Sequence, residues 1–182
     1  MGRLILAAAV LVAAAAVILV PAVLSAPVRG GVSAQPVPVG RSTSEPISCP
    51  HIVLTQGYGP TDLVGEPIIN GVRFHTGWDL ACPAGTAVVS VTAGRAHVTL
   101  GYGGGFGNNV QVQVGNLWVR YAHLEAVLVR DGDQVAPGMV VGLEGSTGFS
   151  TGPHLHFEVD RGCPSVGCSI DPANLISLPG GD

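Results

Sequence analysis

The chain contains no lysine, and charged residues of all kinds make up only 11% of its 182 positions. Without lysine it cannot form a lysine Schiff base, carry a lysine-attached cofactor or supply the lysine of a phosphate-binding loop. All eight basic residues are arginines, none of them clustered into a basic patch, and the formal net charge is −4. Nucleic-acid binding therefore has no electrostatic support in this sequence.

Sustained helical periodicity is missing as well. Glycine and proline together number 41 (27 and 14), which disfavours a helical bundle, whereas a hydrophobic content of 47% is too high for a disordered chain. Only 124–129 is compatible with one short helical turn. Elsewhere strand-like runs alternate with glycine-rich breaks, and Val110, Val112 and Val114 alternate with glutamines as in a half-buried strand. The five clearest runs are 87–91, 95–100, 109–114, 117–123 and 155–159. We therefore predict an all-β domain of antiparallel hairpins.

The N-terminal part divides into two segments with no place in such a domain. An uncharged apolar run from Leu4 to Leu24 is long enough, at about 1.5 Å per residue, to span a hydrocarbon core of about 30 Å. Residues 1–26 are predicted to be a hydrophobic helix, either an uncleaved transmembrane anchor or a cleaved signal peptide. Residues 27–48 are rich in proline, glycine and serine and are interpreted as a linker. The domain then covers 49–178 and lies outside the cytoplasm, anchored to the membrane or secreted to the cell wall.

The segment His154-Leu155-His156 is the sharpest local signal in the chain. Residues i and i+2 of a strand point to the same side, so the two imidazoles would stand together while Leu155 faces the core. Such a pair can ligate a metal ion, although two histidines on a solvated strand face would give the same pattern.

His75 and Asp79 form a second element of the same kind. In an extended segment, positions 75, 77 and 79 share one side, and Gly77 leaves the space between imidazole and carboxylate free. With one histidine of the pair they would make a three-ligand site with an open fourth position, the arrangement of catalytic zinc. Asp79 alone could equally be a turn or capping carboxylate.

His123 ends one of the strand-like runs. A single histidine there is most simply a core or surface residue, but the site still needs a general base and the chain has no HExxH motif. We therefore include His123 as a candidate for proton transfer. His51 and His97 have no comparable neighbours in the sequence and are interpreted as structural or exposed residues.

Five segments now stand in a fixed order: HTGWD at 75–79, GYGGGFGNNV, YAHL, DGDQVAPGMVVG and GSTGFSTGPHLHFEV. This series resembles the lysostaphin-type, LytM-like zinc endopeptidases of family M23, over roughly 53–160. The resemblance implies an antiparallel β-sheet domain of the half-barrel or sandwich type. It implies a metalloendopeptidase that hydrolyses peptide bonds of bacterial peptidoglycan.

The resemblance also implies roles for individual residues. One Zn²⁺ would be held by His75, Asp79 and His156. His123 and His154 would act on the attacking water and the transition state, one as the general base and the other as a donor to the oxyanion. The sequence does not assign these two roles, and it does not identify the bond that is cut.

Strand parity adds two further candidates. Tyr121 shares its parity with His123 and could add a hydrogen-bond donor to the site. Glu158 shares parity with His156 and could orient a ligand histidine, although a solvated strand carboxylate is the alternative. The glycine-rich stretches 101–107 and 145–152 are interpreted either as hairpin turns or as walls of a groove for an extended peptide.

Two rival functions were weighed against the enzyme. The segment DGDQVAPGMVVG also resembles hairpins of biotinyl and lipoyl carrier domains, but these need an attachment lysine that this chain lacks. A non-catalytic zinc-containing activator or wall-binding module, regulating another wall hydrolase, is the remaining alternative. The open three-ligand set with two extra histidines favours the enzyme. We expect a monomer whose partners are a peptidoglycan peptide and, if the N-terminal segment is uncleaved, the membrane.

The four cysteines permit three pairings. Cys163 and Cys168 flank a short segment with a proline and a glycine, which suits a closed turn. Cys82 closely follows Asp79, and Cys49 opens the domain. An oxidising compartment favours bridges over free thiols. We predict Cys163–Cys168 and Cys49–Cys82, and a Cys₄ zinc site is disfavoured because no CxxC pair is present.

Overall fold

The computed structural model describes residues 45–178, and every structural statement below concerns this part of the chain. The predicted N-terminal helix at 1–26 and most of the predicted linker at 27–48 lie outside it. No helix within 45–178 is long and apolar enough to cross a membrane.

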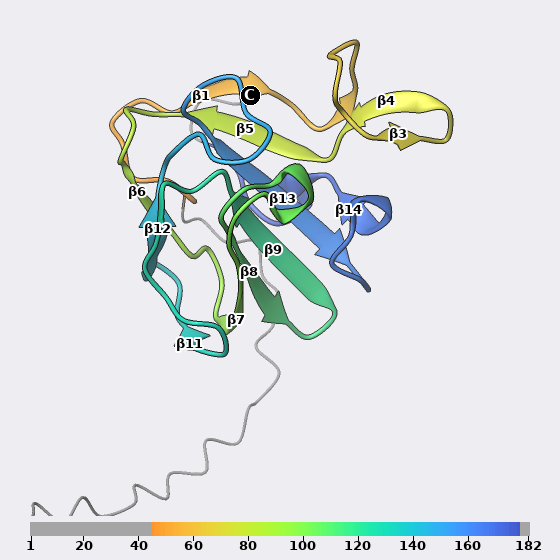
Figure 1. The fold of residues 1–182 in the computed structure, drawn as a ribbon. Coiled ribbons are helices and arrows are strands. Elements are labelled where there is room, and N and C mark those ends of the chain that lie inside the picture. Colours follow the sequence, from red (N-terminus) through yellow and green to blue (C-terminus); the bar gives the residue numbers. More distant parts are fainter. Residues whose placement is uncertain (1–44, 179–182) are drawn as a thin grey trace, which may run out of the picture. The chain divides into compact units, whose positions relative to one another are not determined.

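Short strands make up most of the described chain, and three single-turn 3₁₀ helices are its helical elements (Figure 1). The strands are β1 (Val53–Gln56), β2 (Gly59–Pro60), β3 (Ile68–Ile69), β4 (Val72–His75), β5 (Gly77–Ala81), β6 (Ala87–Val89), β7 (Gly94–Thr99), β8 (Asn109–Val114), β9 (Leu117–Ala122), β10 (Ala126–Val127), β11 (Gln134–Val135), β12 (Val140–Leu143), β13 (Leu155–Arg161) and β14 (Ser169–Ile170). The 3₁₀ helices are η1 (Gly103–Gly105), η2 (Val166–Cys168) and η3 (Pro172–Asn174). The predicted all-β fold is confirmed.

An eight-stranded sheet forms the main layer of the domain. Its strand order is β1-β5-β13-β9-β8-β7-β11, and β14 pairs with β13 off this path. A three-stranded sheet, β10-β12-β6, contributes Val88 and Val141 to the same core, and β2-β4-β3 forms a third sheet. All strand pairs are antiparallel, as the predicted hairpins require.

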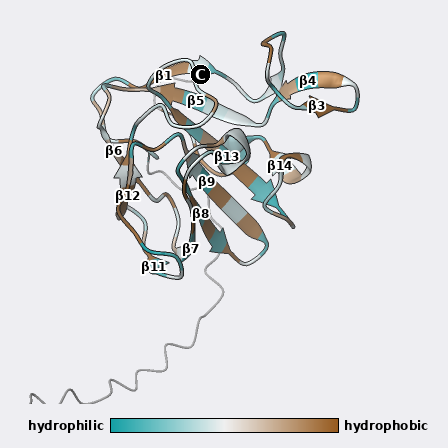
Figure 2. Cartoon of the chain, in the orientation of Figure 1, coloured by the Kyte–Doolittle hydropathy of each residue, from teal (hydrophilic) through white to brown (hydrophobic). Residues whose placement is uncertain are grey.

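The core lies between the first two sheets, and alternation along the strands decides which residues enter it. In β8, Val110 and Val112 are fully buried while Gln111 between them faces the other side. Hydrophobic and hydrophilic residues accordingly alternate along the central strands (Figure 2). Because each buried apolar side chain contributes about 1.5–3 kcal/mol, this single layer accounts for much of the stability of the domain.

Several details of local structure differ from the predictions made from the sequence. The predicted turn at 124–129 is wrong, because this segment is not helical and Ala126–Val127 pairs with β12 as strand β10. Ile47, placed in the linker by its surroundings in sequence, is fully buried and forms a bridge with Val88. The β3–β4 hairpin was not predicted. It turns through Asn70 and Gly71, both at positive φ, which is the signature of an Asn-Gly turn.

Both predicted disulfides are present, Cys49–Cys82 and Cys163–Cys168. The first ties the entry of the domain to the end of β5, the strand that carries Asp79. The second closes the short loop that follows β13. No described cysteine is free, which fits an oxidising compartment.

Candidate functional site

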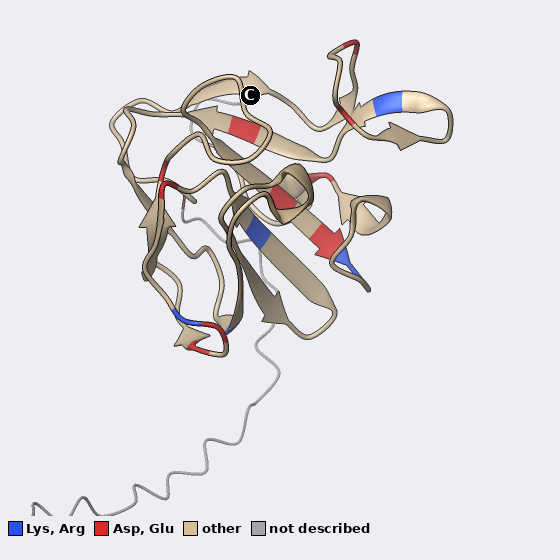
Figure 3. Cartoon of the chain, in the orientation of Figure 1, with Lys and Arg blue, Asp and Glu red and all other residues tan. Residues whose placement is uncertain are grey.

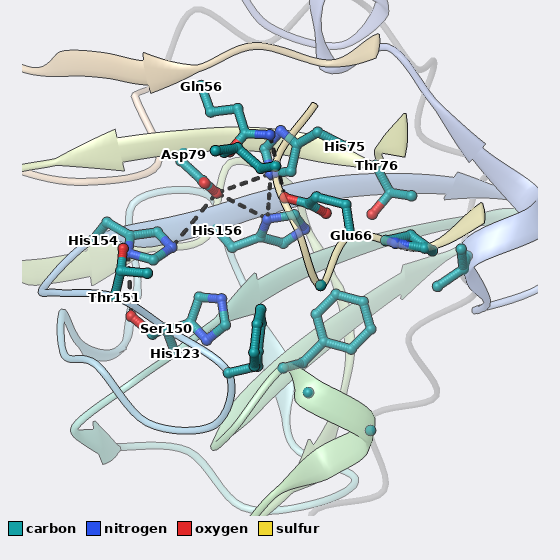
Figure 4. A pocket seen from close by; sticks show the side chains of 18 of the residues that line it. Gln56, Glu66, His75, Thr76, Asp79, His123, Ser150, Thr151, His154 and His156 are labelled. Atoms are coloured by element: carbon teal, nitrogen blue, oxygen red, sulfur yellow. Dashed lines mark hydrogen bonds and ion pairs between the residues drawn. The ribbon is translucent and has the colours of Figure 1, made fainter. Parts of the chain in front are cut away.

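Three side chains from neighbouring strands meet on the outer side of the main sheet. Asp79 of β5 lies directly opposite His156 of β13 in the strand register, so both side chains point to the same face. His75, the last residue of β4, reaches the same point from a position two residues before β5 begins (Figure 4). Leu155 faces the core and is fully buried, as the alternation predicts.

The donor atoms of these three residues converge tightly. His75 Nε2 lies 3.1 Å from Asp79 Oδ1 and 3.1 Å from His156 Nδ1, and His156 Nδ1 lies 2.9 Å from Asp79 Oδ1. Two nitrogens and one oxygen at these separations suit a single ion with bonds of about 2.0–2.2 Å. His75, Asp79 and His156 are therefore a group that could hold a metal ion in the described part of the chain.

The second nitrogen of each histidine is held by an acceptor. His75 Nδ1 donates to the carbonyl oxygen of Gly57 at 2.9 Å, and His156 Nε2 lies 3.4 Å from Glu158 Oε2. In a neutral imidazole these contacts favour the proton on the outer nitrogen, so that His75 Nε2 and His156 Nδ1 point toward a common position, as metal-binding histidines require.

The electrostatics of the group favour a cation. Burial raises the pKa of Asp79, but hydrogen bonds from His156 and His75 outweigh burial and hold the pKa below its usual range. Burial lowers the pKa of His156, yet the Asp79 and Glu158 carboxylates raise it to about 9. A metal ion must displace the proton from the same lone pair, so metal binding at this group depends on pH, and the carboxylates beside His156 favour either cation.

His123 and His154 lie beside this group without belonging to it. Their ring centroids are 4.7 Å apart, and each ring donates from Nδ1 to a carbonyl oxygen at 2.8 Å, that of Thr147 or Gly152. The Nε2 atoms are therefore free to exchange protons, and that of His154 lies 3.6 Å from Asp79 Oδ1. Burial and the nearby charge of His156 lower the pKa of His123 to about 4, so its imidazole is neutral near pH 7.

The structure corrects the expectation for Tyr121. This residue is fully buried, and its hydroxyl accepts a hydrogen bond from the backbone N–H of Val91 at 2.8 Å, on the core side of the sheet. The prediction that Tyr121 and His123 share one side of the strand was wrong, because His123 has a positive φ of 61° and the alternation of β9 stops before it. Tyr121 stabilises the core and does not line the pocket.

Glu158 belongs to a buried polar network that extends from the three-residue group. Its side chain accepts hydrogen bonds from the Thr76 hydroxyl and, at 3.0 Å, from Arg120 Nε. Arg120 Nη2 also lies 3.5 Å from Asp160 Oδ2. In Figure 3 basic and acidic positions accordingly lie next to each other on the central strands of the main sheet. The sequence reasoning missed Thr76 and Arg120. Arg120 shares its parity with Ala122, which faces His156 across the strands, and that was the available signal.

Phe106 covers this network from outside. The Arg120 guanidinium lies 3.9 Å from the centre of the Phe106 ring, and Arg120 Nη2 donates to the carbonyl oxygen of Pro164 inside the Cys163–Cys168 loop. The ion pair is thereby shielded from water, which strengthens its hold on Glu158.

Gly77 provides space for a ligand histidine. A Cβ atom at this position would lie 2.5 Å from the carbonyl oxygen of Phe157 and 2.9 Å from His156 Nε2. Any side chain at 77 would therefore displace His156 or the strand that carries it. The sequence predicted that Gly77 frees the space between His75 and Asp79, whereas the structure shows that the groups it leaves room for are His156 and the backbone of Phe157.

A pocket of about 550 Å³ opens over the site. His75, Asp79, His123, His154 and His156 all line it. Both glycine-rich stretches contribute to its wall, through Gly104, Gly105, Ser150 and Thr151, and several of their glycines also adopt positive φ. Both stretches thus turn through glycines and line the pocket, while the binding of an extended peptide along them stays a prediction. His51 is exposed, and His97 packs against Trp118 away from the pocket.

The chain is 42% identical over 116 residues to the peptidoglycan DD-endopeptidase ShyA of Vibrio cholerae, covering 63% of this chain and 27% of that protein. It is 42% identical over 108 residues to the DD-carboxypeptidase/endopeptidase Mpg of Neisseria meningitidis, covering 59% and 25%. It spans about a quarter of the length of these curated relatives.

Solved structures agree. The catalytic domain of lysostaphin from Staphylococcus simulans superimposes with a TM-score of 0.58 at 34% identity, over 65% of this chain and 87% of that domain. A zinc-containing peptidase from Vibrio cholerae gives 0.59 at 30% identity, over 72% and 39%. The family model "Peptidase family M23" matches residues 73–172, which include every histidine and carboxylate of the site. The chain therefore belongs to peptidase family M23.

Proposed function

We propose that this protein is a zinc-dependent endopeptidase that hydrolyses peptide bonds of peptidoglycan. The observation that carries the proposal is the pairing of a convergent three-ligand group with two further histidines whose Nε2 atoms form no hydrogen bond to the described residues, that of His154 lying 3.6 Å from Asp79 Oδ1. A structural metal site needs no such extra histidines and normally closes its fourth position with a protein ligand. The relatives named as peptidoglycan DD-endopeptidases support the same substrate class.

The donor set fits zinc. His75, Asp79 and His156 supply two imidazole nitrogens and one carboxylate oxygen, and three protein ligands leave a position for water or substrate. When bound there, zinc lowers the pKa of water toward about 7 and polarises a peptide carbonyl.

The two remaining histidines move the protons. In its neutral form His123 can accept a proton from the attacking water at Nε2, because its Nδ1 proton is already engaged with Thr147. His154 presents the same free atom on the neighbouring side. One of them accepts the proton and delivers it to the leaving amine, while the other, when protonated at Nε2 as an imidazolium, donates to the developing oxyanion.

Glu158, Thr76 and Arg120 orient the site. Glu158 accepts from His156, and Thr76 and Arg120 fix the Glu158 carboxylate in turn. This chain of contacts holds the ring of His156 in the tautomer that binds a metal ion through Nδ1.

The proposal includes a location outside the cytoplasm. Peptidoglycan lies outside the cytoplasmic membrane, and the paired cysteines fit an oxidising compartment. Residues 1–26 would act as a membrane anchor or a signal peptide, 27–48 as a linker and 49–178 as the peptidase domain. N-terminal sequencing of the protein from fractionated cells distinguishes an anchor from a cleaved signal.

Digestion of purified sacculi tests the function. The zinc-loaded protein should release peptide-cleaved fragments, identified by mass spectrometry, and the mass of each fragment assigns the bond. His123→Ala, which leaves all three metal ligands in place, is the control for a contaminating hydrolase. Intact sacculi after treatment with the zinc-loaded protein would contradict the proposal and favour a non-catalytic activator.

A further inference from the structure

One carboxylate of the pocket has no part in the zinc site. Glu66 lies in the loop between β2 and β3, is half-buried and lines the same pocket as His75 and His156. No arginine lines this pocket, and no described residue forms an ion pair with Glu66. Glu66 is thus a half-buried carboxyl group of the pocket that has no cationic side chain as a direct partner among the described residues.

Glu66 is held from one side by Gln56. The Gln56 amide donates to Glu66 Oε1 at 3.2 Å and to the Thr61 hydroxyl at 3.4 Å, and Figure 4 shows both side chains directed into the pocket. This contact leaves the second carboxylate oxygen, Oε2, without a hydrogen-bond partner among the described residues. A carboxylate fixed through one oxygen presents the other to a ligand.

The residues on each side of Glu66 are fixed as well. The carbonyl oxygen of Pro67 accepts from the backbone N–H of Phe74 at 2.9 Å, which ties the loop to β4. Gly65 has a φ of 105° and packs so closely on the Phe149 ring that a Cβ atom would clash with it. Glu66 therefore occupies its position before a ligand arrives, which lowers the entropic cost of binding.

The surroundings strengthen an electrostatic contact at this position. Leu63, Val64, Tyr102 and Phe149 line the same pocket with largely exposed apolar side chains. An extended peptide lying against them would exclude water from Glu66, and a charge pair gains strength in the lower dielectric that results.

We propose that Glu66 binds an ammonium group of the substrate, such as the free amine of a diamino acid in a wall peptide. The inference rests on the proposed function and adds the substrate feature that the pocket selects. Glu66 is a specificity residue in this account, because it contacts the substrate beside the zinc site and takes no part in proton transfer.

The test compares soluble cross-linked wall peptides with free amines and the same peptides after acetylation by acetic anhydride. Binding by isothermal titration calorimetry and initial cleavage rates are measured with the zinc-loaded full-length protein. The wild type should prefer the free amine roughly tenfold or more in both measurements, since charge-assisted contacts are the strong ones. Raising the ionic strength should reduce the preference.

Two variants isolate the residue responsible. Glu66→Gln keeps the shape and can still accept from Gln56, and its preference should fall to near one. Asp62→Asn removes one negative charge from the same loop outside the pocket and should keep the wild-type preference. A wild type that ignores acetylation, or a Glu66→Gln protein that keeps the full preference, overturns the inference. Preferential binding without cleavage would support Glu66 as the amine site and contradict the endopeptidase proposal instead.

Discussion

The two faces of strand β13 are about equally buried and chemically opposite. Leu155 and Phe157 on one face are fully buried in the apolar core. His156 and Glu158 on the other face are no more than 5% exposed, but their side chains form hydrogen bonds with charged and polar groups. Burial alone therefore does not distinguish a residue that stabilises the fold from one that serves a site.

The difference lies in how each face compensates for the loss of water. The core face gains free energy from the burial itself. The other face must replace every lost hydrogen bond, and Glu158 does so with Thr76, Arg120 and His156. Changes on the first face should lower stability, and changes on the second should lower metal binding and activity.

Adjacent residues of β13 give the largest contrast. His156→Ala should abolish activity and the thermal stabilisation that added zinc gives the wild type, because a metal ion bound only to the folded state raises its stability. Phe157→Ala should cost about 3–5 kcal/mol of unfolding free energy and still respond to zinc. Denaturant unfolding with and without zinc measures both. If zinc stabilises His156→Ala normally, the division between the faces is wrong.

The histidines beside the ligand group should separate activity from metal binding. We expect His123→Ala and His154→Ala to keep stoichiometric zinc and to lose turnover by about 100-fold or more, the usual contribution of a general acid or base. Initial rates on soluble wall peptides give the answer. Rates within a few-fold of the wild type in both variants would place the proton transfer on other groups.

Gly77 tests the space around His156. Gly77→Ala should weaken zinc binding strongly, because its Cβ would lie 2.9 Å from His156 Nε2. Gly167→Ala, at a position with no atom within 4 Å, is the matched control and should bind zinc normally. Competition with a chelator measures both zinc affinities. An unchanged affinity in Gly77→Ala would show that the His156 ring can move aside without losing the metal ion.

Arg120 tests the network behind the ligand. Arg120→Met leaves Glu158 and Asp160 buried without their cation, and should weaken zinc binding about 10–100-fold, as loss of a residue that orients a ligand does. The unfolding free energy should fall by about 3–5 kcal/mol. Arg161→Met, on the exposed end of the neighbouring strand, should change neither by much. Equal zinc affinity in the two variants would mean that Arg120 serves stability alone.

The smallest effect is expected for the pH dependence of stability at Tyr121, a residue on the core side of the sheet. Burial raises the pKa of its phenol to about 12, so the folded state favours the neutral form. Since the folded pKa exceeds the unfolded value of about 10, this stabilisation is complete below pH 10 and is lost as pH rises toward 12, at up to about 1.4 kcal/mol per pH unit. Urea unfolding at several alkaline pH values should show this slope in the wild type. The slope should be reduced in Tyr121→Phe, and an identical slope in both proteins would exclude Tyr121 as its source.

The sequence was informative where chemistry follows a local period. The alternation in Asn109–Val114 predicted a strand and its buried side, and the spacing of His75, Gly77 and Asp79 predicted a shared side. Prediction failed for Tyr121, because one residue at positive φ ended the alternation at His123.

Other features were out of reach of local reasoning. Arg120 meets Glu158 only through the register of two strands that are distant in sequence. Glu66 lies in a loop outside the motifs, and its environment depends on Gln56 and Phe149, which come from other elements. Contacts of this kind are set by tertiary structure and leave no periodic trace in the sequence.

The central claim is that His75, Asp79 and His156 bind zinc while His123 and His154 transfer protons. Zinc content and turnover, measured on one set of purified proteins, test this claim most directly. Elemental analysis should find one zinc ion per chain in the wild type, His123→Ala and His154→Ala, and none in His156→Ala. Peptide release from sacculi should occur in the wild type alone. Stoichiometric zinc in His156→Ala, or full activity without zinc, would contradict the account.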